Sequence, residues 1–450
     1  SDPFLGVPVP GTARTFQFTW RDQPMSIDLG SAPLVELRWG LYLFVPSLTA
    51  LRSMRHWAAT PVQAPVAAAP VPPMPPTDFA TWKRRMEDAT LREPAWAAVR
   101  SQPGGVLRTD YGVLVGSKAA VMEVFLDPRQ RYSVHGYGER MRASVGLGYL
   151  GQDGDTGHAS TAPAVNAAIE QIREDQAYDE TYRLVTQRLS TLRTALPARE
   201  AAAGVPVDLP ELCEMVIGQL CTRWFGLPDP AGDYMTVGPW STESRTTPTC
   251  PGHFVSASKF VFSPRPSEMV RQHGRHQGRL LREVVTEFLR LAPPAAFGPL
   301  TRDIVQALGD GQVTAANADL LGRTVTGILL GFGPTVLGNL RTVLYRWVSD
   351  RSLWDLQAAL RDADGPAPHG YMLANATLRK PLVDALLARP TPAVVWRTAR
   401  EDHTLQGVEI REGDRLIVGI ASATQADLAA AVRDIYTVFG GSRTPGDWAG

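Results

Sequence analysis

One apolar stretch of the chain combines residue types that suit a ligand site, Gly331-Phe332-Gly333-Pro334-Thr335. Glycines let a flat ligand lie against the backbone, and a proline leaves a carbonyl one turn earlier, near Leu330, free to bond a water or a substrate oxygen. Thr335 or Asn339 would then point at that ligand. The alternative interpretation of the same pattern is a kinked helix without a ligand.

The cysteines and paired histidines give weaker signals for chemistry. The three cysteines, Cys213, Cys221 and Cys250, are too few for a disulfide framework and have no metal-ligand spacing. Cys213 and Cys221 lie two turns apart on an apolar helix, so we expect them in the core, and a buried structural thiol is also the default for Cys250. The stretch RQHGRHQGR (271–279) contains two histidines three residues apart, but no further ligand follows, which favours a solvated basic face.

The sequence predicts helices for most of the residues considered above. From Asp78 onward, several long segments carry apolar residues at a spacing of three to four, with helix starts indicated by Asp208 before Leu209 and by Ser267 before Glu268. The longest helix is expected over 315–350. Short β signals appear late, at 393–399, 407–410 and 414–421, with a turn at Gly413-Asp414. The expected fold class is therefore mainly α with a small β region.

Composition divides the chain and limits its partners. The proline-rich, uncharged stretch 60–77 is a linker between an N-terminal extension or tail of a neighbouring domain, 1–59, and a large domain, 78–450. With 45 basic and 45 acidic residues the formal charge is zero, which favours a small neutral or amphiphilic ligand over nucleic acid. Without a transmembrane run or signal peptide, we expect a cytoplasmic protein with no membrane span.

The order of motifs after the long helix resembles the C-terminal half of a cytochrome P-450, a haem-thiolate enzyme. The residues that carry the resemblance are Pro390, Pro392, Arg397, Ala399, Asp402, Gly407, Ile410, Gly413 and Asp414. The resemblance implies a cytochrome P-450-like fold with haem b as cofactor and Arg397 on a haem propionate. The resemblance extends upstream to the segment that leads to the haem-contacting helix. There it implies that His158 is a second propionate partner.

The chain closes on VFGGSRTPGDWAG (438–450). In the resemblance, Phe439, Gly440, Gly441 and Arg443 belong to the loop that leads to the axial cysteine. That cysteine is expected a few positions beyond Gly450, so no metal ligand is expected within the chain itself.

The resemblance also assigns roles along the long helix. It implies that Gly331 contacts the haem, that Pro334 and Thr335 are catalytic, and that Leu330, Phe332 and Val336 contact the substrate. Val394, in the later β region, is a further expected substrate contact.

Two departures bear on the reaction. Oxygen-activating members carry an acid and a threonine in the long helix to relay protons, whereas glycine and proline, Gly333 and Pro334, stand there. The chain resembles in particular the P-450-type domains that rearrange fatty-acid hydroperoxides in dioxygenase fusions, and related bacterial proteins. These domains and peroxide-using relatives also lack the pair. The Glu-x-x-Arg motif of the following helix is missing, with Val383 and Leu386 at its places; Asp384 and Arg389 could supply part of it.

Three functions therefore stay open. The first is a haem-thiolate enzyme that acts on a fatty-acid-like hydroperoxide or uses peroxide as its oxidant. The second is an oxygen-dependent monooxygenase served by a separate redox partner. The third is a haem-free, cytochrome P-450-like binding or docking module. The expected partners are a small hydrophobic or fatty-acid-like substrate and, for the monooxygenase, a redox partner, but no nucleic acid.

Overall fold

The computed structural model describes residues 15–20, 23–28, 34–36, 41–46, 78–87, 89–198, 201, 204–227, 251–349 and 370–429. The chain forms two compact units. Unit 1 comprises residues 1–67, 172–220 and 340–379, and unit 2 comprises 68–171, 221–339 and 380–450. Both boundaries of the expected linker, at 59/60 and 77/78, lie outside the described residues.

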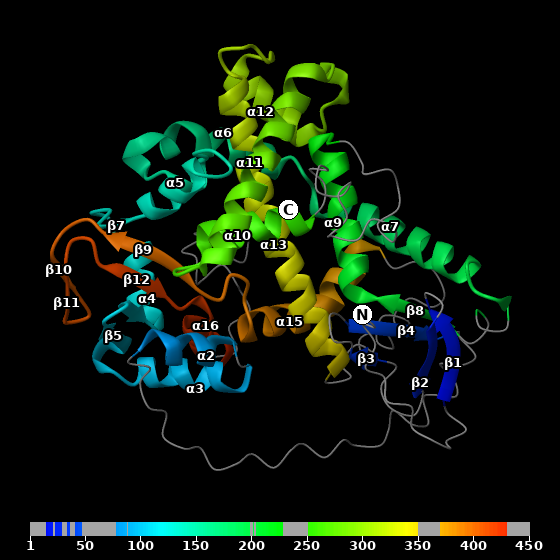
Figure 1. The fold of residues 1–450 in the computed structure, drawn as a ribbon, viewed down its shortest axis with the longest axis horizontal. Helices are drawn as coiled ribbons and strands as arrows, with labels where there is room; N and C mark the ends of the chain where they lie inside the picture. Colours follow the sequence, from blue (N-terminus) through cyan, green and yellow to red (C-terminus); the bar gives the residue numbers. More distant parts are fainter. Residues whose placement is uncertain are drawn as a thin grey trace. The chain divides into compact units, whose positions relative to one another are not determined.

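Unit 2 is mainly helical with one mixed sheet (Figure 1). Three helices run from one unit into the other: α9 (Leu209–Phe225), α13 (Ala318–Ser349) and α15 (Tyr371–Ala388). The other helices and turns of unit 2 are α2 (Phe79–Glu87), α3 (Ala89–Arg100), η1 (Pro103–Gly105), α4 (Lys118–Phe125), α5 (His135–Arg142), η2 (Tyr149–Gly151), the π-helical turn η3 (Gly154–His158), α6 (Ala159–Glu170), α10 (Pro251–Phe262), α11 (Glu268–Leu291), η5 (Pro294–Ala296), α12 (Pro299–Gly309) and α16 (Ile420–Ala429). Its strands are β5 (Val106–Thr109), β6 (Gly112–Val115), β7 (Tyr132–Ser133), β9 (Val395–Ala399), β10 (His403–Leu405), β11 (Val408–Ile410) and β12 (Arg415–Val418).

Strands β10 and β11 of unit 2 form an antiparallel pair, and a five-stranded sheet joins strands far apart in the sequence. Its order is β5-β6-β12-β9-β7, with β6 and β12 parallel and the other neighbours antiparallel. The parallel strands β6 and β12 are short and mainly apolar, which is typical of strands covered on both faces. Helices α4 and α16 pack with Val113 and Leu416 on one face, while α2 and α3 pack with Leu114 and Ile417 on the other.

Unit 1 contains a separate small sheet. Strand β4 (Leu41–Pro46) lies between β3 (Leu34–Glu36) and β8 (Gly204–Asp208), and both pairings are antiparallel. Strands β1 (Thr15–Trp20) and β2 (Gln23–Asp28) form a hairpin, and α7 (Glu174–Thr194) is a described helix that lies wholly within unit 1. Val205, Val207 and Leu209 are buried in one apolar cluster with Val348 of α13.

Local capping explains where several helices begin. Ser267 accepts a hydrogen bond from the Val270 N–H at 3.4 Å at the start of α11, and Asp208 accepts one from the Glu211 N–H at 3.1 Å at the start of α9. Both starts were expected from the sequence and are confirmed. The late β signals are also confirmed as β9, β11 and β12, with Gly413 at a φ of +82° in the turn between the last two.

Helix α13 is the long core helix expected near 315–350. It is continuous through Pro334 and is the one described helix long and apolar enough to cross a membrane. Burial of 61% of its most apolar window is the pattern of a core helix.

Candidate functional site

The centre of α13 combines a fully packed side with a partly open one. Leu330 has no exposed surface, whereas Gly331, Phe332, Pro334, Thr335 and Val336 are half-buried. The Phe332 ring lies 5.6 Å from that of Trp224, centre to centre. This stretch therefore presents small and apolar groups along one side of the helix, while the contact expected between Leu330 and a ligand stays a prediction.

Two glycines on this helix differ in the space around them. A Cβ at Gly331 would come within 3.2 Å of the Leu150 side chain in η2, whereas at Gly333 the nearest atoms would belong to Phe254, at 3.8 Å. The helix backbone at Gly331 is therefore covered closely by a side chain, and Gly333 has room for a methyl group.

The polar groups of α13 are arranged for a dry environment. Hydroxyls of Thr324 and Thr326 donate to carbonyls one turn earlier, at 2.8 and 2.7 Å, but the Thr335 hydroxyl has no hydrogen bond within the described part of the chain. No charged residue occurs between Arg323 and Arg341. Thr335 can therefore bond a ligand, and this part of the helix has no acid to deliver a proton.

Arg397 lies on β9, and part of its guanidinium has no partner among the described residues. Its Nη1 donates to the Trp396 carbonyl at 2.9 Å and to the Tyr137 hydroxyl at 3.3 Å, and its guanidinium lies over the rings of Phe125 and Tyr137, at 5.4 and 5.5 Å. Burial raises the pKa of Tyr137, so this hydroxyl stays protonated. Arg397 forms no ion pair with any carboxylate of the described residues, which leaves Nε and Nη2 for an acidic group of a ligand.

A neighbouring arginine, Arg400, is committed to a protein carboxylate. Its Nη2 donates to Asp153 at 2.7 Å, and Asp153 also accepts from the Val134 N–H at 2.8 Å and from the Ser133 hydroxyl. Burial would raise the pKa of Asp153, but these hydrogen bonds and the charge of Arg400 lower it overall. This network fixes the segment before α6 to the chain after β9.

His158 ends the π-helical turn before α6 and is half-buried. Its ring lies 6.0 Å from the Tyr149 ring, and its backbone N–H donates to the Asp153 carbonyl at 3.4 Å. The ring has no hydrogen bond to the described residues, so its expected role on a propionate stays a prediction.

Two other residues have structural roles. Asn339 is held by the backbone of Thr391 through hydrogen bonds in both directions, and the ligand contact considered from the sequence stays a prediction. Val394 packs against the apolar cluster of α2, α3, β6 and β12 that contains Trp82 and Trp96. Its expected contact with a substrate stays a prediction.

The described cysteines do not suit metal binding. Cys213 and Cys221 are buried, and burial raises the pKa of each thiol to about 12, so both are thiols rather than thiolates. No group of three or more His, Cys, Asp or Glu side chains among the described residues could hold a metal ion. Cys250 and the loop residues Phe439, Gly440, Gly441 and Arg443 lie outside the described residues.

No protein-family model and no curated protein matches this chain. Solved structures do match it. Cytochrome P-450 CYP268A2 of Mycobacterium marinum in complex with pseudoionone is 18% identical, with 84% of this chain and 85% of that chain covered and a TM-score of 0.52. The haem domain of P450DA is 15% identical, with 83% and 81% covered and a TM-score of 0.59. P450BioI in complex with an acyl carrier protein ligated to hexadec-9Z-enoic acid is 11% identical, with 79% and 82% covered and a TM-score of 0.51.

The chain has the cytochrome P-450 fold. The expected fold class is thus confirmed, including the small β region. Likeness at these identities establishes the fold, and chemistry has to be argued from the residues.

Arg397 is a donor of the kind that a haem propionate would need, because its Nε and Nη2 have no partner among the described residues. On α13, Gly331 is covered by Leu150 and Gly333 is buried, so Phe332, Pro334, Thr335 and Val336, which are half-buried, would be the residues left for a flat ligand. A thiolate ligand for iron, which the resemblance implies, would not be supplied by Cys213 or Cys221. It would have to come from outside the described residues.

Proposed function

We propose that this protein is a haem-thiolate enzyme of the cytochrome P-450 type that acts on a small hydrophobic or fatty-acid-like molecule. The observation that carries the proposal is Arg397, whose guanidinium is held on β9 by Tyr137 and by its own strand yet has no acidic partner among the described residues. A haem with a cysteine thiolate ligand would supply cleavage of an O–O bond. Arg397 would bind a propionate, and His158 is the candidate for the other.

Peroxide or a fatty-acid hydroperoxide is the oxidant that the helix favours. Charged residues are absent from Thr324 to Leu340, and Leu329 and Leu330 are fully buried. Such a stretch excludes water and positions a reacting group by packing, but it does not relay protons. A substrate that already contains an O–O bond needs no proton delivery to dioxygen. Thr335, whose hydroxyl is available, would orient that substrate.

A monooxygenase is the second candidate. Its support is the likeness to the P-450 structures above, which include one in complex with pseudoionone and one in complex with an acyl carrier protein ligated to hexadec-9Z-enoic acid. This chemistry would require a redox partner and a water in place of the missing acid.

Absorbance and turnover test the proposal together. The purified protein should show a Soret band and, when reduced, the carbon monoxide spectrum of a thiolate-ligated haem. Product formation from a fatty-acid hydroperoxide, or from a fatty acid with hydrogen peroxide, should require no reductant. Turnover only with NAD(P)H, a ferredoxin and dioxygen would replace this reaction by the monooxygenase, and absence of haem after reconstitution would leave a haem-free binding module.

A further inference from the structure

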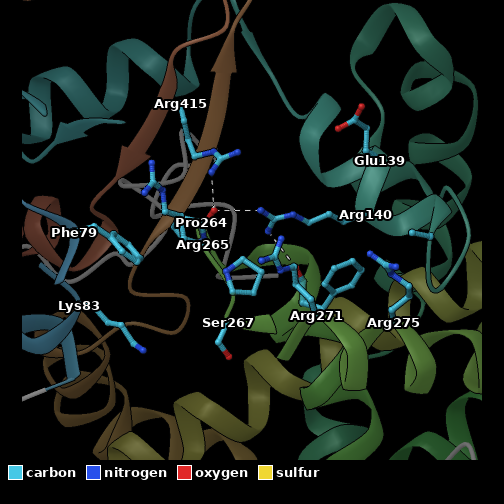
Figure 2. A pocket seen from close by; sticks show the side chains of 13 residues that line it. Phe79, Lys83, Glu139, Arg140, Pro264, Arg265, Ser267, Arg271, Arg275 and Arg415 are labelled. Carbon is cyan, nitrogen blue, oxygen red and sulfur yellow. Dashed lines mark hydrogen bonds between the residues drawn. The ribbon is translucent and has the colours of Figure 1, made fainter. Parts of the chain in front are cut away.

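A cavity of about 580 Å³ in unit 2 carries six cationic side chains on its wall (Figure 2). Its wall comes from α2, α5, α10, α11, the connection 263–267 and β12. The charged residues on it are Lys83, Arg140, Arg265, Arg271, Arg275 and Arg415, with Glu139 as the single acid. The Oε1 of Glu139 lies 3.3 Å from the Nε2 of His135, and both side chains are exposed. Positive charge concentrated in a concave wall raises the local concentration of anions.

Two of these arginines are held close together. Arg140 and Arg415 donate to the same carbonyl, that of Pro264, at 3.2 and 3.1 Å, and their guanidiniums lie 4.6 and 4.9 Å from the Trp396 ring centre. Burial and the charge of Arg415 lower the pKa of Arg140 to about 10, and burial and the charge of Arg265 lower the pKa of Arg415. The positive charges of Arg140 and Arg415 are thus held beside one another by the Pro264 carbonyl and the Trp396 ring.

Backbone carbonyls satisfy only part of this positive charge. Arg140 also donates to the carbonyls of Phe260, Val261 and Ser263 at the end of α10, but neither Arg140 nor Arg415 pairs with a carboxylate of the described residues. The Nε of Arg415 is buried and has no hydrogen-bond partner in the described part of the chain. A buried donor without a partner is costly, so the guanidinium of Arg415 stays incompletely bonded by the described protein groups.

Arginines on α11 complete the wall. Arg271 and Arg275 lie one turn apart, and Figure 2 shows both side chains on the cavity side of the helix. The Nη2 of Arg271 lies 3.0 Å from the Oε2 of Glu268. Because both side chains are more than half exposed, this ion pair is weak. Arg275 lies over the Phe260 ring at 5.6 Å and pairs with no carboxylate of the described residues. Both can turn toward an anion at little cost.

The same cavity has an apolar part. Phe79, Phe260, Ala143 and Pro266 line it beside the arginines, and Arg265 lies over the Phe79 ring at 5.0 Å. An inorganic anion would contact the arginines but not these apolar side chains, so a ligand with an apolar part suits the cavity better. A volume of about 580 Å³ is within the range of small-molecule sites.

We propose that this cavity, which we call the arginine cavity, binds an amphipathic carboxylic acid, with its carboxylate among Arg271, Arg275 and Arg415 and its hydrocarbon part against Phe79 and Phe260. Guanidiniums suit a carboxylate because their parallel N–H groups match its two oxygens. The proposal does not depend on haem, since every residue that it uses belongs to the protein wall.

Calorimetric titration with decanoate and with decanamide tests the head group. The two ligands have the same chain, but only decanoate carries a charge, so we expect decanoate to bind at least about tenfold more tightly. Its affinity should also fall as sodium chloride is raised, because screening weakens the attraction. Equal affinity for both ligands, or no binding of decanoate, would overturn the proposal.

Variants locate the site. Arg271→Gln with Arg275→Gln should weaken decanoate binding by about tenfold or more without changing the melting temperature, because both side chains lie on the exposed surface of α11. Arg290→Gln is the matched control, since Arg290 is an exposed arginine of the same helix paired with Glu287 at 3.4 Å and is not part of the cavity wall. If the double variant and the control changed the affinity for decanoate equally, decanoate would not bind at Arg271 and Arg275, and the proposed site would be wrong.

Further ligands separate the carboxylate from other anions. Decyl phosphate binding more tightly than decanoate would overturn the assignment of a carboxylate, as would binding of an acidic peptide, polyglutamate, without binding of decanoate. The titration is made with and without haem. Loss of the haem spectrum with decanoate binding intact would remove the proposed enzyme function and leave the arginine cavity.

Discussion

Asn339 of α13 and Thr391, which precedes β9, are joined by hydrogen bonds in both directions. The Asn339 Nδ2 donates to the Thr391 carbonyl at 3.1 Å, and the Thr391 N–H donates to the Asn339 Oδ1 at 2.9 Å. Gly338 allows the approach, because a Cβ there would come within 2.6 Å of the Thr391 side chain. The central helix therefore fixes the start of the strand that carries Arg397.

Asn339→Ala should destabilise the protein by about 1–3 kcal/mol, since it leaves both backbone groups of Thr391 without this partner. Urea unfolding measures the change. Asn166→Ala on α6 is the control, because Asn166 is exposed and should change stability by less than about 0.5 kcal/mol. Equal stability of the two variants would show that the link between Asn339 and Thr391 contributes nothing.

Arg397→Leu should lower haem affinity by about tenfold or more, because a charge-assisted hydrogen bond contributes about 1.5–3 kcal/mol. The Soret absorbance during haem titration reports this, and circular dichroism checks that the helices persist. Arg397→Lys should restore little, since an ammonium cannot reproduce the fork of a guanidinium. Arg411→Leu is the control, because Arg411 is an exposed arginine of the same β region, paired with Glu409. Unchanged haem affinity in Arg397→Leu would contradict the proposed propionate contact.

Local signals made much of the helical structure predictable. Ser267 and Asp208 mark helix starts through bonds to N–H groups three residues later, and such bonds depend only on neighbouring sequence. The long helix is also a local pattern. At Pro334 the sequence indicated a kink or a groove; α13 runs through this residue as one helix, and the kink stays a prediction.

Non-local pairing was missed. Strands β5 and β6 were not predicted, although Gly112, at a φ of +147°, follows Asp110-Tyr111 as a turn signal. The run Val113–Val115 is buried, and a short apolar run does not distinguish a buried strand from a piece of helix. Its parallel partner, Leu416–Val418, lies some 300 residues away in the sequence.

The arginine cavity was missed for a similar reason. The stretch RQHGRHQGR was interpreted as a solvated basic face, and Arg271 and Arg275 are indeed exposed. Their significance arises because Arg140 and Arg415, from α5 and β12, lie on the same cavity wall. No periodicity within α11 contains that information. The position of Arg397 could be expected, by contrast, because its neighbours in sequence carry the resemblance.

Asp153→Asn should make stability less dependent on pH in acid. The pKa of Asp153 is lowered from its ordinary 3.8, so its bonds to Ser133, Val134 and Arg400 stabilise the fold above about pH 3.8 and are lost as pH falls through the lower folded-state pKa. At pH 7 the variant should be about 1–3 kcal/mol less stable than the parent. The difference should shrink below about pH 3.8 in urea unfolding. Asp310→Asn, at an exposed position, is the control; a constant difference across pH would refute the assignment.

Gly333→Asp with Pro334→Thr tests whether α13 favours peroxide over dioxygen. A Cβ at Gly333 would be 3.8 Å from Phe254, so the side chain fits, but its carboxyl would enter a buried, apolar surrounding and would attract water. We therefore expect lower turnover with peroxide or hydroperoxide and a shift of the haem spectrum toward the water-bound, low-spin form. Gly333→Ala is the control, because it adds the Cβ without a polar group and should keep most activity. If the double variant keeps full peroxide turnover while the parent works only with dioxygen and a reductant, the proposed role of this dry stretch is wrong and the monooxygenase replaces it.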